Sequence, residues 1–241
     1  MSKLSRRRWQ RIPEWKSWFY GLISVLVALV LVAGCVVNLG GSGVRGSGNV
    51  KTETRPVIGF SSIAFKSEGK VIVQQTGKES LVISAEDNLL PLLESRVADN
   101  VLYLGTVNEA DINPTKPIEF VMEVKSLESF KMTGVGSIEA KGIQGKNMTI
   151  DLTGVGNMTI EGNADSLDLS LEGVGSYQGE AFKTKKTTVQ SEGVGSAVVN
   201  ASEQLDVSVS GVGGVEYVGS PTVQKSGQGL GQVKQRVTKA N

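Results

Sequence analysis

Gly134-Val135-Gly136 is the first of five copies of one tripeptide in the second half of this chain. The later copies are Gly154-Val155-Gly156, Gly173-Val174-Gly175, Gly193-Val194-Gly195 and Gly211-Val212-Gly213. Successive copies are separated by 20, 19, 20 and 18 residues. A nearly constant period of this length is typical of solenoids, in which each repeat packs only against its neighbours.

Apolar residues recur at fixed distances from the first glycine of each copy. Two residues before it stand Met132, Leu152, Leu171, Ser191 and Val209, and four before it stand Phe130, Ile150, Leu169, Val189 and Val207. Six residues before the first glycine of the last four copies are Met148, Leu167, Thr187 and Leu205. Four residues after the first glycine of every copy are Ile138, Met158, Tyr177, Ala197 and Val215. Such alternation with a period of two is typical of strands with one buried face. Each repeat is therefore expected to supply two strands that meet at a glycine corner.

These patterns predict an all-β fold, a right-handed parallel β-helix with coils of 18–20 residues. The glycines would permit a positive φ or a tight bend where a β-carbon would clash, and we expect the valine between them to face the core. The corner glycines are Gly134, Gly136, Gly154, Gly156, Gly173, Gly175, Gly193, Gly195, Gly211 and Gly213. An earlier coil is predicted where residues 65–69 resemble residues 130–134, so that Gly69 would correspond to Gly134.

The amino-terminal segment, residues 1–34, is predicted to be a lipoprotein signal peptide or a membrane-anchor helix. A basic stretch precedes an uncharged, almost wholly apolar run from Ser17 to Val37, which is long enough to cross a bilayer. Leu31-Val32-Ala33-Gly34-Cys35 resembles a bacterial lipobox, in which the cysteine receives lipid. Cleavage with lipidation at Cys35 and an uncleaved anchor are both open. Either one predicts a chain held at the cell membrane on its extracytoplasmic side, in the periplasm or at the cell surface.

Composition divides the rest of the chain. Residues 35–48 are rich in Gly and Ser and predict a flexible linker, residues 49–227 carry the solenoid pattern, and residues 228–241 predict a polar tail. Lys225 stands where the apolar column would continue, which indicates that the core stops there.

The residue inventory excludes several kinds of chemistry. The chain has no histidine and one cysteine, so His-based acid/base catalysis, a Cys-His nucleophile and a His/Cys zinc site are ruled out. We expect no metal and no cofactor. The formal net charge is +1, but residues beyond position 34 hold 19 basic and 23 acidic groups, which argues against a nucleic-acid partner.

Polar residues occupy the alternate, outward positions of each repeat, and these columns are where a site is expected. Candidate residues for a cation-binding or glycan-binding face are Asp151, Asp168, Glu172, Glu192 and Asp206. Glu172 and Glu192 are expected on neighbouring coils about 5 Å apart, close enough for a cation to bridge them. The other interpretation is a solvated face that keeps the solenoid soluble.

Residues 46–231 resemble the head GIN domain family, described as auto-transporter adhesins. The resemblance rests on residues 46–50, 55–60 and 87–90, and on Leu127-Glu128-Ser129-Phe130-Lys131-Met132-Thr133-Gly134 with its copies. It implies a secreted or surface-anchored β-solenoid and brings no catalytic residues. We expect a non-enzymatic envelope lipoprotein that acts in adhesion, surface binding or envelope assembly, with glycans or other surface proteins as partners. The alternative is a polysaccharide-acting enzyme with Asp168, Glu172, Glu192 and Lys185 or Lys186 in a cleft.

Overall fold

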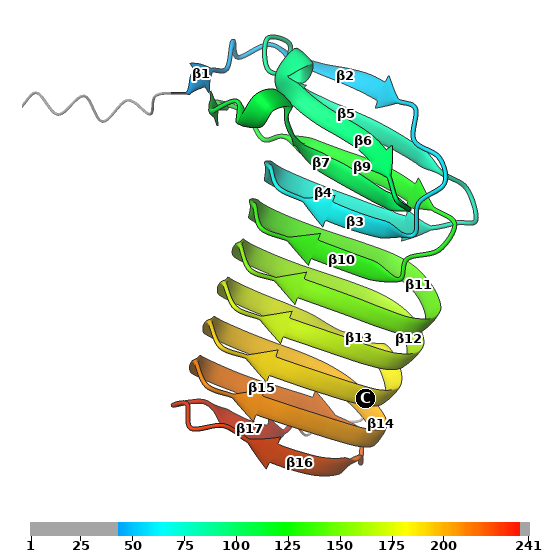
Figure 1. The fold of residues 1–241 in the computed structure, drawn as a ribbon, viewed down its shortest axis with the longest axis vertical. Coiled ribbons are helices and arrows are strands. Elements are labelled where there is room, and N and C mark those ends of the chain that lie inside the picture. Colours follow the sequence, from blue (N-terminus) through cyan, green and yellow to red (C-terminus); the bar gives the residue numbers. More distant parts are fainter. Residues whose placement is uncertain (1–42, 237–241) are drawn as a thin grey trace, which may run out of the picture. The chain divides into compact units, whose positions relative to one another are not determined.

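The structure, a computed structural model, describes residues 43–236. The described chain is all-β and forms a β-solenoid of about five turns (Figure 1). No helix within residues 43–236 has the length and apolar character needed to cross a bilayer. The predicted anchor helix and Cys35 lie outside the described residues.

Four long strands form the regular part of the solenoid, and each of them follows most of one coil. They are β11 (Val135–Leu152), β12 (Val155–Leu171), β13 (Val174–Ser191) and β14 (Val194–Val209). Each strand pairs in parallel with the next, and the register joins equivalent residues, such as Gly156 with Gly175. The predicted stacking of repeats in one register is therefore confirmed.

The core consists of the columns that the sequence pattern placed inward. Side chains two, four and six residues before each corner and four residues after it are at most 9% exposed, as are the three polar members Ser191, Thr187 and Tyr177. The Tyr177 hydroxyl is buried without a hydrogen-bond partner, and burial raises the pKa of this phenol. The interior is thus a stack of like positions from successive coils.

The coil before these strands has a different register from the predicted one. β3 (Ser62–Phe65) pairs with β10 (Ser129–Met132), and β4 (Glu68–Gln75) pairs with the start of β11. Gly69 lies beside Gly136, whereas the sequence comparison matched it with Gly134, two residues away. A shift of two residues leaves every side chain on the same face of the strand, so apolar alternation cannot distinguish the two registers.

The amino-terminal end of the solenoid departs from the simple coil. Its other elements are β1 (Val44–Arg45), β2 (Val50–Arg55), β5 (Ser80–Glu86), η1 (Leu90–Leu92), β6 (Leu93–Ala98), β7 (Val101–Thr106), η2 (Val107–Glu109), β8 (Ile112–Asn113) and β9 (Glu119–Val124). β7 and β9 continue the parallel stack on β3 and β4, while β2, β5 and β6 pair in antiparallel fashion. These antiparallel strands cover the amino-terminal end of the core (Figure 1).

The last coil extends beyond the predicted end of the solenoid. It contains β15 (Val212–Val218), β16 (Thr222–Ser226) and β17 (Gln232–Gln235), and β17 pairs in parallel with β15. The segment predicted to be a polar tail from residue 228 thus contributes a strand to the sheet. Lys225 belongs to this coil, and its Nζ donates a hydrogen bond of 2.7 Å to the carbonyl of Val233.

Candidate functional site

The glycine corners are tightly packed along the stacking direction. A β-carbon on Gly154 would overlap the carbonyl oxygen of Gly134, and one on Gly156 would overlap the carbonyl oxygen of Gly136. Gly156 also has a φ of 153°, a conformation that side chains disfavour. Glycine is required at both positions, because the backbone of each coil occupies the space that a side chain would need.

The valine between the glycines faces solvent, so the prediction that it faces the core is wrong. The five valines are 49–55% exposed. The inward positions at the corner fall on the two glycines, because the alternation that buries Met132 and Ile138 also passes through Gly134 and Gly136. Val135, between them, must then point outward.

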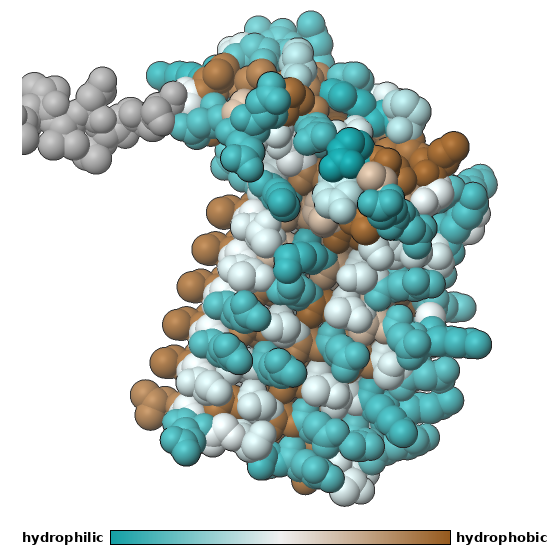
Figure 2. Space-filling model, viewed as in Figure 1, coloured by the Kyte–Doolittle hydropathy of each residue, from teal (hydrophilic) through white to brown (hydrophobic). Residues whose placement is uncertain are grey.

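These valines form a straight apolar row that we call the valine ladder. It consists of Val135, Val155, Val174, Val194 and Val212, followed by Leu230, which is 85% exposed. Leu230 continues the row because its N–H bonds to Gly211 O, as the N–H of Val212 bonds to Gly193 O. Figure 2 shows the ladder as a row of hydrophobic side chains along one edge of the coils. Gly229-Leu230-Gly231 is thus a further corner that the sequence analysis missed, although its spacing of 18 residues from Gly211 was a visible signal.

The predicted acidic face lies beside this ladder on outward positions of the preceding strand segments. Glu172 and Glu192 are exposed and lie on neighbouring coils, since the N–H of Glu192 bonds to Leu171 O at 2.9 Å. The Ser170 hydroxyl donates to a carboxylate oxygen of Glu172 at 3.3 Å. These two carboxylates are the members of the candidate set that the fold brings side by side.

Asp151 lies in a different column, and both of its carboxylate oxygens are engaged. Lys131 Nζ lies 2.6 Å from Oδ2, and the Thr153 hydroxyl donates to Oδ1 at 2.7 Å. Partial burial raises the pKa of Asp151, but the hydrogen bonds and charge of its partners outweigh this and lower it. Asp151 is therefore an anionic partner of Lys131 within the sheet.

Asp168 and Asp206 share a third column, but Thr188 lies between them in the register. Asp206 accepts a hydrogen bond of 2.7 Å from Gln204 Nε2, and its other oxygen is buried without a hydrogen-bond partner. The five candidate carboxylates are therefore spread over three columns. Within residues 43–236, no group of three or more Asp, Glu, His or Cys side chains is arranged to hold a metal ion.

Lys185 and Lys186, the lysines of the alternative enzymatic hypothesis, have different surroundings. Lys185 Nζ lies 2.7 Å from Asp165 Oδ1, a carboxylate outside the candidate set, and the two side chains are 60% and 55% exposed. Lys186 lies in register with Ser166 and Gln204. A shallow hollow beside Glu192 and Asp206 is lined by Thr188, Val189, Gln190, Val207, Ser208, Gln224, Lys225 and Ser226.

A second cluster of polar contacts, which the sequence analysis missed, fastens the amino-terminal segment. The Glu86 carboxylate is fully buried and accepts hydrogen bonds from the N–H groups of Gly48, Thr115 and Lys116 at 2.6, 2.8 and 3.3 Å, and from the Thr115 hydroxyl. Burial raises the pKa of Glu86, but these donors outweigh it and hold the pKa below its usual value. Ser47 is held in addition by Asp87 and Asn88. Residues 43–48 of the predicted flexible linker are therefore packed against the body.

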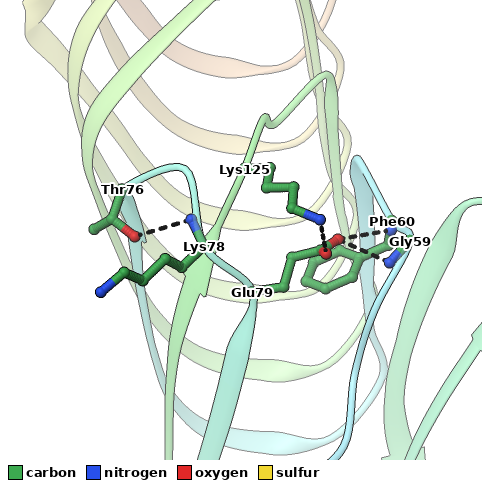
Figure 3. Close-up of polar contacts among 6 residues, drawn as sticks. All are labelled: Gly59, Phe60, Thr76, Lys78, Glu79 and Lys125. Atoms are coloured by element: carbon green, nitrogen blue, oxygen red, sulfur yellow. Dashed lines mark hydrogen bonds and ion pairs between the residues drawn. The ribbon is translucent and has the colours of Figure 1, made fainter.

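Glu79 fastens the loop before the first coil in a similar way (Figure 3). One carboxylate oxygen accepts hydrogen bonds from the N–H groups of Gly59 and Phe60 at 2.8 and 3.3 Å, and the other lies 2.6 Å from Lys125 Nζ. The bond to Lys125 is the main cause that lowers the pKa of Glu79. These acidic residues are structural, and no periodic signal in the sequence identifies them.

Comparisons with known proteins agree with this architecture. Residues 59–221 match the family described as "Putative auto-transporter adhesin, head GIN domain". No curated protein is significantly similar to the chain.

Solved structures share the fold over most of the chain. A putative adhesin from Bacteroides fragilis is 28% identical with a TM-score of 0.67, and the match covers 80% of this chain and 100% of that one. Putative adhesins from Parabacteroides merdae and Parabacteroides distasonis are 20% and 19% identical, with TM-scores of 0.54 and 0.52. These two matches cover 81% and 80% of this chain and 99% and 100% of the others. Because the family match spans more than half of its residues, this chain belongs to the head GIN domain family.

Proposed function

We propose that this chain is a membrane-tethered extracytoplasmic lipoprotein whose β-solenoid acts, without catalysis, in adhesion, surface binding or envelope assembly. The family description supports the adhesive part, as does the similarity to the Bacteroides fragilis protein described as a putative adhesin. The apolar run and the lipobox-like residues 31–35 support the tether.

The repetition of outward side chains is the observation that carries the proposal. Equivalent positions recur on successive coils at about 4.8 Å, so a ligand that extends along the coils can contact outward side chains of several coils at once. Glu172 and Glu192 supply two adjacent exposed carboxylates on this face. A cation or a glycan held through its hydroxyl groups suits such a pair.

A glycan array with a calcium titration, performed on the detergent-solubilised full chain, tests the binding role. We expect glycan binding that is lost in the Glu172→Gln/Glu192→Gln double variant and retained in Glu161→Gln, a matched change at an exposed carboxylate outside the three columns. Equal loss in both variants, or retention in the double variant, would refute the assignment to this face. If no glycan binds, the glycan part of the proposal is wrong.

Metabolic labelling with a fatty acid tests the tether separately. The wild-type chain should incorporate label, and Cys35→Ser should abolish it, because Cys35 is the only thiol in the chain. Undiminished labelling of Cys35→Ser would contradict lipidation at this residue.

A further inference from the structure

The valine ladder is an apolar surface with no packing partner among residues 43–236. Its six side chains are 49–85% exposed in one continuous row, and each belongs to a different coil. Isolated exposed valines are ordinary, but a contiguous apolar row at this length is typical of an interaction surface. The ladder is therefore a candidate binding surface.

The surroundings of the ladder restrict what its partner can be. On one flank the outward column alongside the six rungs is uncharged and consists of Ser137, Asn157, Ser176, Ser196, Gly214 and Gln232. Charge returns only on β4, where Glu68 lies beside Val135 and Lys70 beside Ser137. On the other flank, next to the same valines, the charged residues of the outward column are Glu172 and Glu192. Glycines precede and follow every rung from Val135 to Leu230 on inward positions, so the nearest outward side chains of the same coil are those two residues before and after each rung. A partner with its own apolar ridge can pack beside the rungs on the uncharged flank without burying a charge.

The spacing of the rungs selects among possible partners. Stacked coils place equivalent side chains about 4.8 Å apart, whereas one face of a strand places them about 6.7 Å apart and a helix about 5.4 Å per turn. Over five steps these spacings amount to about 24, 33 and 27 Å, so a strand or a helix loses register along the ladder. A second solenoid of the same kind keeps every rung in contact.

We propose that the valine ladder is a self-association surface on which a second copy of this chain packs, ladder beside ladder. With both chains running in the same direction, a two-fold axis along the stacking direction lets each ridge pack beside the other's uncharged flank. The columns with Glu172 and Glu192 then lie on the outer sides of the pair. Such an isologous interface uses the same surface on both copies.

The area of the ladder is sufficient for a weak but specific dimer. A half-exposed valine offers on the order of 50 Å² of apolar surface, so the six rungs offer about 300 Å² per copy. The uncharged flank adds a comparable area, which brings the total for two copies to about 1,200 Å², the lower end of specific interfaces.

Disulfide cross-linking of the full chain tests the proposal. In a Cys35→Ser background, Val174→Cys places the only thiol in the middle of the ladder. Lys183→Cys is the matched control, since it is an exposed residue of the same strand about half a coil away. Under mild oxidation we expect a covalent dimer from Val174→Cys at a yield several-fold above that of Lys183→Cys. Equal yields, or no dimer from Val174→Cys, would overturn the proposal.

A second set of variants separates self-association from other occupants. Adding Val155→Asp and Val194→Asp to the Val174→Cys variant should abolish its cross-link while circular dichroism still reports a folded β-protein. Val155→Thr and Val194→Thr, which suit strands and keep the side-chain shape, should weaken the cross-link less and serve as the folding control. A cross-link that survives both aspartates contradicts the proposal. A fluorophore attached to the thiol of the Val174→Cys variant provides a second check in vesicles that contain nitroxide lipids. Quenching of this fluorophore by the nitroxide lipids would place the ladder against a membrane and would also contradict the proposal.

Discussion

The coils from β10 to β15 and the strands before them are held by different kinds of contact. In the coils, each residue lies beside its equivalent one repeat away, such as Gly156 beside Gly175, and the same interaction recurs at every level. In residues 43–128, unlike segments meet, and buried carboxylates such as Glu79 and Glu86 join loops that are far apart in the sequence. The stability of the coils therefore depends on residues that suit every repeat, whereas the stability of residues 43–128 depends on individual side chains.

The largest effect is expected from a β-carbon at a corner. Gly154→Ala should lower the free energy of unfolding by about 3 kcal/mol or more, because the new methyl group would overlap the carbonyl oxygen of Gly134 and force two coils apart. Urea denaturation followed by circular dichroism measures the loss. Gly145→Ala is the control, since its β-carbon would meet Leu127 O at an ordinary 3.7 Å, and a similar loss there would show that the corner is not special.

A smaller and local effect is expected from Glu86→Gln. The amide keeps the shape of the side chain but loses the charge that four hydrogen bonds stabilise, so the segment at residues 46–49 should loosen while the coils stay intact. Amide hydrogen exchange should rise at residues 46–49 and 115–116 and stay unchanged in β12 and β13. Glu94→Gln, at a partly exposed ion pair with Arg96, should change neither region.

The same carboxylate gives this region a pH dependence. The pKa of Glu86 is lower in the folded chain than its usual value of 4.5, so its stabilising effect is complete above that value and is lost as pH falls through the lowered pKa. Hydrogen exchange of the segment should therefore increase selectively in mildly acidic solution below pH about 4.5. The Glu86→Gln variant should lack this dependence, and an unchanged acid response in the variant would assign it to another group.

Two valines of neighbouring coils test the direction of the ladder. Val189→Thr places a hydroxyl in the core, where the side chain is fully buried, and should cost about 1–3 kcal/mol. The Val194 side chain is 53% exposed, so the free energy of unfolding of Val194→Thr should stay within about 0.5 kcal/mol of the wild-type value. Thermal or urea unfolding distinguishes them, and equal losses would contradict the outward orientation of the corner valine.

The smallest effect is expected on the polar face. Asp151→Asn removes the ion pair with Lys131, whose side chain is 53% exposed, so the loss should be at most about 1 kcal/mol and should shrink as salt is added. Asp168→Asn, at an exposed position on the next coil, is the control and should change stability less. A large, salt-independent loss at Asp151 would mean that this carboxylate has a structural role like that of Glu86.

The regular coils could be predicted from the sequence because their signal is repeated. Columns such as Phe130, Ile150 and Leu169 fix both the period and the inward face, and the structure confirms both. The direction of the corner valine was also encoded, since unbroken alternation through Met132, Gly134 and Gly136 puts the valine outward. Its apolar character suggested the opposite, and the alternation was the more reliable signal.

The amino-terminal region and the candidate site were less accessible to prediction. The first coil retains Phe65 and Gly69 but not the tripeptide, so its register could be fixed only by hydrogen bonding. Contacts such as that of Glu86 with Thr115 arise once in the molecule and leave no pattern to detect. The columns of the acidic residues could be predicted, but their partners, such as Gln204 for Asp206, depend on side-chain conformations that no periodicity specifies.

The in-register stacking of the corners also bears on how such a chain can change in length over evolution. The backbone of each regular coil pairs with the coil before and the coil after it, and every corner presents the same backbone surface to its neighbour. Duplication or loss of one 18–20-residue segment would therefore join equivalent surfaces and alter the reach of the protein by about 4.8 Å. The first and last coils would keep their contacts, so relatives can differ in length by whole coils without changes at either end of the solenoid.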